Sequence, residues 1–386
     1  MANSLTNLVP DLYEAVDVVS REMVGFIPAV SLMSSADRAA LNENIRVPIT
    51  PAAAAEDATP GQLPPDDGDQ TITNNVVTIS KSRIVPFRWT GDDQMGLNNQ
   101  IPNGGYAKLR QQQVQQAIRT LVNEIEGNVA ALYSTTSRAT GTAGTTPFAS
   151  NLSDPANARK ILSDNGAPLS DMQMVIDTTA GASMRSLTQL TKANEAGTTE
   201  LRAQGTLLEI SGFNIRESAG VKEAVVVGSV TGAVTGSASA GATTVTLTTP
   251  SGGAVAVLAG DVVTFAGDTN KYVVAAACTI GASTTGTLTL TAPGLRTTIS
   301  SAAITVVGVA TRNLFFARSA LVLATRQIAL PEEGDMAEDR ITIVDPRSGI
   351  AFEFAMYKQY RRVRYEVGLA YGWANIKPEH TGILLG

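Results

Sequence analysis

The sequence predicts an α+β fold in which one long helix and a mixed α/β region are followed by an inserted all-β unit. Apolar residues recur at helical spacing over 106–133. Helix-like and strand-like stretches then alternate over 151–228, and the composition turns to Thr, Val, Ala, Gly and Ser over 229–308. The chain has 386 residues. This exceeds one ordinary hydrophobic core, so about two or three subdomains are expected.

The composition narrows the class of protein. Hydrophobic residues make up 44% of the chain and charged residues only 17%, with 34 Gly and 17 Pro. This favours an ordered protein that hides much of its surface, including against copies of itself. The formal net charge is −6. Tight binding of nucleic acid through phosphate neutralisation is therefore not expected, although an acidic subunit can still line a container filled with DNA.

The first residues predict a short amphipathic helix. Leu12, Val16, Val19 and Met23 follow Pro10 at helical spacing. This stretch lacks the features of a signal peptide, and no apolar run reaches the roughly 18–20 residues of a membrane span. We therefore expect a soluble protein that is not exported by the usual route.

A long two-stranded hairpin is predicted over 44–98. Ile45, Val47 and Ile49 alternate with polar or turn residues, and a second extended stretch runs from Val77 to Phe87. Between them, 51–70 is rich in Ala, Pro, Gly and Asp. Such a hairpin buries too little apolar surface to be stable alone, so it needs a partner surface in its own chain or in the next one. The alternative is a surface hairpin with a disordered loop.

The helix over 106–133 is the strongest local prediction. Its apolar stripe is formed by Val114, Ile118, Leu121, Ile125, Val129 and Leu132. Glu124 and Glu126 are assigned to the polar side. At 1.5 Å per residue the helix is roughly 40 Å long, which suits an element across which others pack.

Shorter elements complete the pattern. Helices are expected at 157–164 and 181–193, and strands at 172–177, 207–210 and 213–216. The predicted strands of the all-β unit are 243–248, 262–265, 272–275, 287–291 and 304–307. After it, strands are expected at 341–344, 351–356 and 362–369, with a final turn at Tyr371-Gly372-Trp373.

No catalytic constellation is found. His380 is the only histidine and Cys278 the only cysteine, so neither a base for a nucleophile nor a zinc site can be assembled from these residue types. His380 is interpreted as a solvated terminal residue and Cys278 as a small buried one. Asp66 and Asp67 lack calcium-loop spacing, and no phosphate-binding glycine motif occurs. We expect no enzyme activity, no cofactor and no metal.

The densest basic cluster lies near the carboxyl end of the chain. It comprises Arg361, Arg362 and Arg364 between Tyr360 and Tyr365. On a strand, Arg362 and Arg364 would lie on one face and Arg361 on the other, so no broad patch for nucleic acid forms. Ion pairing between subunits and simple surface exposure both stay open.

The order of the parts resembles the HK97-like major capsid protein fold of tailed bacteriophages. The closing residues carry much of the resemblance: 312–316, 320–324, 352–356 and 367–378. Within that family, 229–308 resembles the inserted β-barrel domain of the P22-type coat proteins, most closely at 260–267. The resemblance covers essentially the whole chain but rests on architecture and weak local patterns.

The resemblance implies a division of the chain. Its parts would be an N-terminal arm (1–43), the E-loop hairpin (44–98), the spine helix and peripheral domain (99–150), the first part of the axial domain (151–228), the inserted β-barrel (229–308), and the remainder of the axial domain with the closing peripheral strands (309–386).

The resemblance also implies a function. It implies a coat protein that assembles with itself into hexamers and pentamers of an icosahedral shell in the bacterial cytoplasm, enclosing double-stranded DNA that it contacts non-specifically. Scaffolding and portal proteins are implied as partners, a decoration protein as a further one, and no membrane. We hypothesise that contacts between subunits involve the hairpin residues Asp66, Asp67, Lys81, Arg83, Phe87 and Arg88.

Two other classes stay open. A secreted or surface carbohydrate-binding or adhesin-like protein would explain the Thr- and Gly-rich β-region, but not the long helix. A mixed α/β enzyme would explain 172–215, but not the scarcity of histidine and metal ligands.

Overall fold

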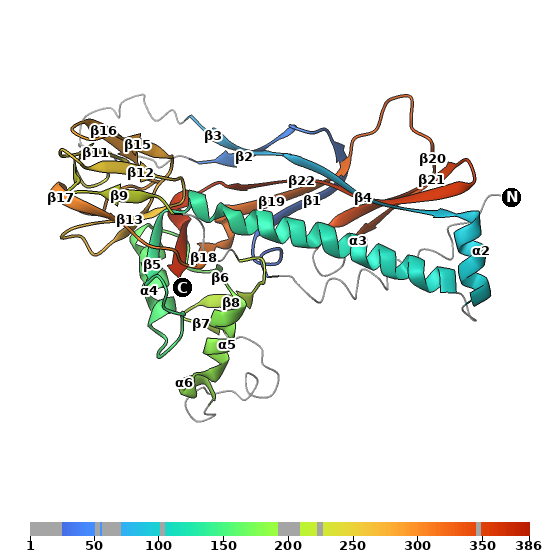
Figure 1. Cartoon of the computed structure of the whole chain (residues 1–386), viewed down its shortest axis with the longest axis horizontal. Helices are drawn as coiled ribbons and strands as arrows, with labels where there is room; N and C mark the ends of the chain where they lie inside the picture. Colours follow the sequence, from blue (N-terminus) through green and yellow to red (C-terminus); the bar gives the residue numbers. More distant parts are fainter. Residues whose placement is uncertain are drawn as a thin grey trace, which may run out of the picture.

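A computed structural model describes residues 25–50, 55, 71–100, 105–191, 209–221, 227–344 and 349–386. The fold is mixed α/β and consists mostly of strands. The molecule is elongated, with a long helix below a sheet, an all-β unit at one end and a small α/β region below (Figure 1). The expected amino-terminal helix and the tip of the hairpin lie outside the described residues.

The first sheet has six strands. They are β1 (Ser31–Ala39), β4 (Lys81–Thr90), β19 (Leu321–Ile328), β20 (Ala337–Val344), β21 (Ala351–Gln359) and β22 (Arg362–Asn375). The order is β1-β19-β22-β21-β20, and β4 pairs with β22 as well. Only β1 and β19 are parallel.

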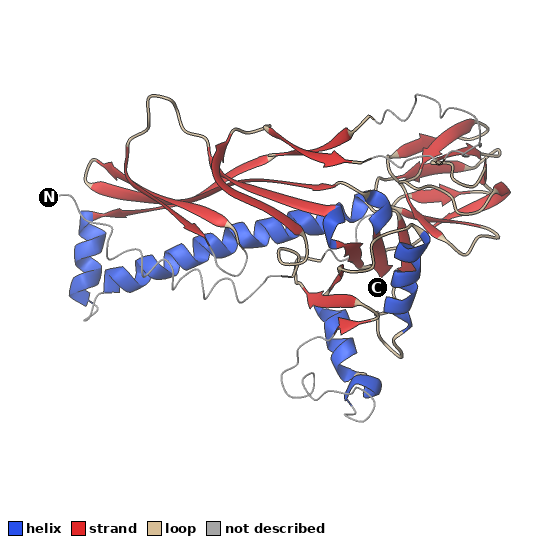
Figure 2. Ribbon diagram, turned by 180° about the vertical axis from the view of Figure 1, so that it is seen from behind, coloured by secondary structure: helices blue, strands red, loops and turns tan. Residues whose placement is uncertain are grey.

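Helix α3 (Gly105–Ala130) packs on one face of this sheet. Its buried residues include Val114, Ile118, Leu121, Ile125 and Val129, which confirms the predicted stripe. They meet the odd-numbered residues of β22 from Tyr365 to Tyr371, because alternate side chains of a strand point to the same face. Figure 2 shows the helix running along most of the sheet.

The hairpin is shorter than predicted. Only β2 (Asn44–Ile49) and β3 (Thr73–Thr78) pair with each other. The second half of the expected hairpin is β4. It pairs with β22, from Lys81 opposite Tyr371 to Thr90 opposite Arg362. Residues after Thr90 form helix α2 (Gly91–Gln100), which the sequence analysis did not predict. A strand partner more than 270 positions away leaves no local signal, so alternation alone could not assign β4.

The second sheet has twelve strands. They are β5 (Arg138–Gly141), β6 (Met172–Ile176), β7 (Glu209–Ile210), β8 (Phe213–Glu217), β10 (Thr235–Ala238), β11 (Thr244–Thr248), β13 (Val262–Phe265), β14 (Lys271–Val273), β16 (Thr285–Thr289), β17 (Ile299–Val306), β18 (Arg312–Ala317) and β23 (Thr381–Leu385). Their order is β16-β11-β10-β17-β13-β14-β5-β23-β18-β6-β8-β7.

Short helices flank the α/β part of this sheet. They are α4 (Ser153–Asp164), α5 (Thr178–Ser186) and α6 (Thr188–Thr191), with 3-10 turns η2 (Ala131–Thr135), η3 (Arg318–Ala320) and η4 (Pro378–His380). The helix expected at 157–164 is α4, which begins four residues earlier, and the strands expected at 172–177 and 213–216 are β6 and β8. The single helix expected at 181–193 is wrong: α5 and α6 are separate helices, and Leu187 between them is extended. Residues 192–193 and 207–208 lie outside the described part of the chain. Asp177 begins α5 by accepting hydrogen bonds from the amides of Thr179 and Ala180, as an N-cap residue does.

The strands of 229–306 have a hydrophobic cluster of their own. β9 (Ser229–Thr231), β12 (Ala254–Val257) and β15 (Cys278–Ile280) form a separate three-stranded sheet. The cluster contains Val245, Leu247, Phe265 and Leu288 and draws all its buried members from this segment. The region is all-β, as predicted, although β9, β10, β12 and β15 were missed.

Six of these strands follow one another in the sheet, and two backbone hydrogen bonds connect the first of the six with the last. Ala275 donates to Thr289 O at 2.9 Å, and Thr291 donates to Val273 O at 3.0 Å. They flank a bridge between Val274 and Leu290 and connect β14 with β16, the first and last members of the run β16-β11-β10-β17-β13-β14.

The closing segment differs from the prediction at one place. Tyr371-Gly372-Trp373, expected to be a turn, continues β22 and pairs with β19. A Cβ on Gly372 would lie 2.0 Å from Thr78 O, so the absence of a side chain lets the base of the hairpin cross the sheet here.

Candidate functional site

The face of the six-stranded sheet away from α3 is only partly covered. Along β4, Val85, Phe87 and Trp89 belong to or pack on the core beneath α3, so Ile84, Pro86 and Arg88 lie on the opposite face. Ile84 is 47% exposed, and Pro86 and Arg88 are exposed as well. β4 therefore presents an open stripe with an apolar and a basic part.

The hairpin lies on this same open side. Val77 and Ile79 at its base are buried against Val322, Ala324 and Ala370, so this part of the hairpin has its partner surface in its own chain. Further from the base the hairpin is exposed, with Ile72 at 63% and Val76 at 45%. In Figure 1 the hairpin and α3 lie on opposite sides of the sheet.

The charged residues of β4 that were predicted for contacts between subunits lie on different faces of the sheet, according to whether their positions are odd or even. Lys81 and Arg83 lie on the helix side, and each places a nitrogen 2.8 Å from Glu124 Oε1. Partial burial opposes ionisation of Glu124, but hydrogen bonds from Lys81 and Arg83 outweigh it and hold the pKa of this carboxyl below its usual value. These two cations are thus already engaged within the chain.

The other predicted contact residues differ in their surroundings. Phe87 stacks on Tyr365 with ring centroids 5.4 Å apart, inside the chain. Arg88 is exposed and has no hydrogen bond or ion pair with the rest of the described chain. Asp66 and Asp67 lie outside the described residues. A role for all these residues in contacts with a neighbour stays a prediction, and Arg88 is the described one whose charge is available.

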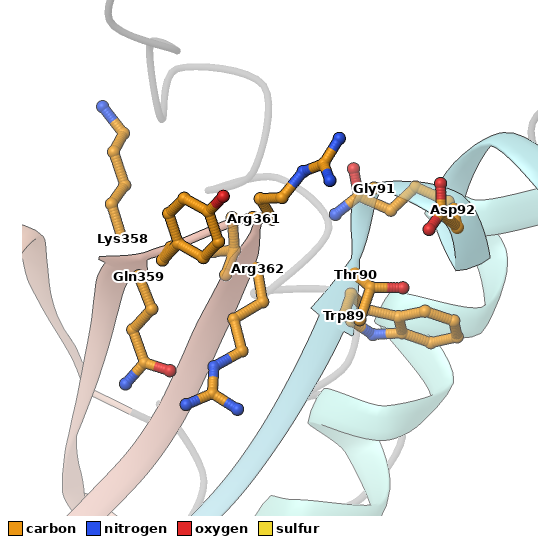
Figure 3. A pocket seen from close by; sticks show the side chains of 11 residues that line it. Trp89, Thr90, Gly91, Asp92, Lys358, Gln359, Arg361 and Arg362 are labelled. Carbon is orange, nitrogen blue, oxygen red and sulfur yellow. The ribbon is translucent and has the colours of Figure 1, made fainter.

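A cleft lies at the end of the sheet next to α2. It has a volume of about 590 Å³ and lies between 89–94 of β4 and α2 and 358–363 of the β21–β22 turn (Figure 3). Tyr360 is 90% exposed, and Arg361 adopts a positive φ of 55° in the turn. The predicted alternation therefore holds for Arg362 and Arg364 on β22, whereas Arg361 is not part of a strand.

Trp89 forms one wall of the cleft and is held in place from behind. Its indole nitrogen donates to Gln113 Oε1 at 2.7 Å, and its ring meets Tyr106 edge to face at 5.4 Å. Both partners belong to α3, so the long helix fixes the position of this wall.

Glu126 on α3 is a buried carboxylate that the sequence analysis assigned to the polar face. It is 2% exposed and accepts hydrogen bonds at 3.0 Å from the amides of Phe26 and Ile27, and at 2.9 Å from the Ser218 hydroxyl. Burial raises its pKa, although these hydrogen bonds oppose the rise. Its position four residues after Val122, within the buried stripe, was the signal that could have identified it.

The all-β unit joins the rest of the chain through another buried acid. Asp261 Oδ2 accepts hydrogen bonds from the amides of Gly228 at 2.9 Å and Leu258 at 2.7 Å, so it ties the entry of the unit to the start of β13. Arg312, just after the unit, is 1% exposed; burial lowers its pKa, and nearby Tyr133 and Asp261 oppose this.

The residues considered for catalysis are not brought together. Cys278 is half-buried in β15, where its thiol contacts Thr287 O, so it is less buried than predicted. His380 lies in η4 and is partly buried rather than solvated, which lowers its pKa. Among the described residues, no group of three or more His, Cys, Asp and Glu side chains could hold a metal ion. None of the described helices is long and apolar enough to cross a membrane.

No protein-family model and no curated protein matches the chain. The chain is similar to the capsid structure of the cyanophage P-SCSP1u, with 11% identity over 94% of this chain and 88% of that chain and a TM-score of 0.46. It is also similar to the asymmetric unit of the mature capsid of bacteriophage PhiM1, with 12% identity over 94% of this chain and 87% of that chain and a TM-score of 0.46.

A third similar structure is a virus-like particle from Pyrococcus furiosus, with 10% identity over 97% of this chain and 98% of that chain and a TM-score of 0.44.

Proposed function

We propose that this chain is a major capsid protein of the HK97-like type. Copies of it would form hexamers and pentamers of an icosahedral phage shell that encloses double-stranded DNA. We propose a structural role for it, without a catalytic step.

The observation that carries the proposal is the open side of the six-stranded sheet. One face is filled by α3, whereas the other has exposed apolar residues on β4 and on the β2–β3 hairpin: Ile84, Ile72 and Val76. A two-stranded hairpin is marginal unless it packs on another surface. Exposed apolar positions beside charged ones are typical of an interface between subunits. A second copy that covers this side would complete the packing of the hairpin.

The contacts of α3 with both ends of the sheet support the same function. A shell multiplies each contact by symmetry, so a weak contact suffices if the contact surfaces are held in fixed relation. Helix α3 links the cleft, through Trp89 and Gln113, to the opposite end of the sheet, where Asn128 donates to the Tyr371 hydroxyl at 2.9 Å. One helix thus connects surfaces far apart on the subunit.

We further propose that 229–308 is an inserted domain built on a small closed β-barrel. The hydrogen bonds of Ala275 and Thr291 that join β14 to β16 support a ring of six strands. Its own hydrophobic cluster supports folding as a unit. The β14–β5 pairing, Lys271 with Ala139 and Tyr272 with Arg138, would attach it to the host sheet.

The partners and location follow from the same function. We propose the virion shell as the site of the protein after assembly in the host cytoplasm. Its main partner would be its own copies, with scaffolding, portal and decoration proteins as further ones. The net charge of −6 suits a wall that encloses DNA without holding it tightly.

A hairpin variant tests the proposal. Residues 50–72 are replaced by a short Gly-Asn turn, which leaves β2 and β3 in register. We expect this variant to keep its circular dichroism spectrum and to form fewer closed particles under negative stain, because it lacks the connection between β2 and β3 and the exposed Ile72. Particles of normal size and stability from the variant would refute this role of the hairpin.

A further inference from the structure

The cleft beside α2 has two cations available for a ligand. Arg361 and Arg362 are both exposed, and neither forms an ion pair with any residue of the described chain. Lys358, by contrast, is already paired with Glu338 at 2.6 Å. Figure 3 shows the side chains of Arg361 and Arg362 extending in different directions. The cleft therefore presents two guanidinium groups and a fully accessible aromatic ring.

An acidic connection lies between β19 and β20. In this segment Glu332 and Glu333 are exposed and form no hydrogen bond or ion pair with another described residue. The amide of Gly334 donates to Pro331 O at 3.0 Å, so the two glutamates occupy the corners of a tight turn. In Figure 1 the connection arches away from the sheet on the side opposite α3.

The connection is fixed at its end, although its turn is open to solvent. Asp335 forms an ion pair with Arg340 and accepts a hydrogen bond from the Tyr357 hydroxyl at 2.9 Å. Met336, the next residue, is 84% exposed. The turn therefore has a defined position. Its two carboxylates, of Glu332 and Glu333, have no partner among the described residues, and the apolar side chain of Met336 follows them.

We propose that the cleft of one copy receives the acidic turn of a second copy, so that Glu332 and Glu333 bind Arg361 and Arg362 across the interface. The inference rests on the proposed function and names one contact that it needs. Two carboxylates match two guanidinium groups, and the exposed Met336 and Tyr360 would bury apolar surface beside these ion pairs.

The local charge favours a second copy over a polyanion such as DNA. Asp92 lines the cleft together with the two arginines, and the acidic turn is attached to the neighbouring strand β20. A phosphate chain that entered the cleft would meet the carboxylate of Asp92 as well as the cations. A protein surface with both signs of charge has no such penalty.

The turn and the cleft are different parts of the molecule, so each copy can offer its turn to one neighbour and its cleft to another. A ring requires this heterologous arrangement, because two copies that insert their turns into each other's clefts stop at a dimer.

Charge reversal of each side tests the proposal with the full chain. The first variant carries Arg361→Glu and Arg362→Glu, and the second carries Glu332→Lys and Glu333→Lys. Each alone places like charges at every contact. We expect each to raise the critical concentration for particle formation at least about tenfold, as measured by light scattering. A third variant that carries all four substitutions has opposite charges at every contact again, and particles should return.

A conservative variant is the matched control. Arg361→Lys with Arg362→Lys keeps the charge and should assemble close to the wild type. If either reversal variant fails to fold by circular dichroism, a double-mutant cycle with neutral substitutions replaces it. One variant carries Arg361→Gln and Arg362→Gln, a second carries Glu332→Gln and Glu333→Gln, and a third carries all four. The effects of the two changes should then be non-additive, since they remove the same contact.

Three results would overturn the inference while leaving the proposed function intact, because wild-type particles form in each. They are folded reversal variants that assemble normally, a folded four-substitution variant that does not recover assembly, and additive effects in the neutral cycle. Normal particles from the first variant that lose only their DNA would assign the cleft to a polyanion instead. Wild-type protein that forms no particles at all would refute the proposed function itself.

Discussion

The carboxylate of Glu126 lies 3.0 Å from the amide nitrogen of Phe26, one hundred positions away in the sequence. The same carboxylate binds the amide of Ile27 and the hydroxyl of Ser218. It therefore joins three parts of the chain: the stretch that leads into β1, the long helix, and the end of β8. We infer that this junction fixes how the α/β region is held against the sheet.

Removal of this carboxylate should destabilise the protein strongly. Glu126→Ala leaves two buried amides and a hydroxyl without their acceptor, which should lower the free energy of unfolding by about 3 kcal/mol. Urea unfolding of the unassembled chain measures this. Glu126→Gln keeps one acceptor oxygen and the shape of the side chain, so its loss should be smaller. Equal effects of the two substitutions would contradict the assigned hydrogen bonds.

The pH dependence of the same site has a definite sign. Burial raises the pKa of Glu126, so its contribution to stability is largest below the unfolded-state pKa and is lost as the pH rises through the folded-state pKa. The difference in unfolding free energy, wild type minus Glu126→Gln, should therefore fall between acidic and neutral pH. Groups with a lowered pKa, such as Glu124, have the opposite effect on stability as the pH rises. They are present in both proteins, so their effect cancels in this difference. A difference that grows with pH would contradict the direction.

The charged residues of β4 should separate into two kinds. Lys81→Gln should destabilise the isolated chain modestly, because Lys81 is paired with Glu124, whereas Arg88→Gln should leave the unfolding midpoint unchanged. Arg88→Gln should instead weaken assembly, since Arg88 lies on the open face. Unfolding and light scattering on both variants check this. A stability loss only at Arg88 would mean that the face assignment of β4 is wrong.

A methyl group at the crossing of hairpin and sheet should not be tolerated. Gly372→Ala brings a Cβ to within 2.0 Å of Thr78 O, which is backbone and cannot move alone. We expect a loss of about 3 kcal/mol in unfolding free energy. Gly96→Ala is the matched control, because that site in α2 has open space and a helix favours Ala over Gly by about 1 kcal/mol. Similar stability of the two variants would refute the crossing.

The all-β unit should fold without the rest of the chain. A fragment of residues 228–308 should unfold cooperatively on heating, because its cluster is internal. Within it, Leu288→Ala should cost about 3 kcal/mol, since Leu288 is fully buried. Thr287→Ala on the exposed side of the same strand should have little effect. A fragment with no cooperative transition would show that the unit depends on its pairing with β5.

The sequence allowed prediction of those elements whose cause is local. The apolar stripe of α3 and the β-prone runs of β11 and β13 are visible within a few residues, and these elements were placed nearly correctly. The partner of β4 was not, because it is set by β22 at the other end of the chain. The hairpin was overextended for the same reason.

The site was harder to predict than the fold. Lys81, Arg83 and Arg88 look alike in the sequence, yet strand parity gives the first two an internal partner and leaves the third exposed. The cleft is lined by residues 89–94 and 358–363, which are far apart in the chain, so no local sequence pattern could predict it. Only the basic cluster at 361–364 indicated that this end of the chain could pair with another surface.

Electron microscopy of the purified full-length chain tests the central claim most directly. Under conditions that promote association, we predict closed icosahedral particles in which the β2–β3 hairpin of each copy covers the open sheet face of a neighbour. A chain that stays a monodisperse monomer at every concentration, or that associates only through other surfaces into open aggregates, would contradict the account.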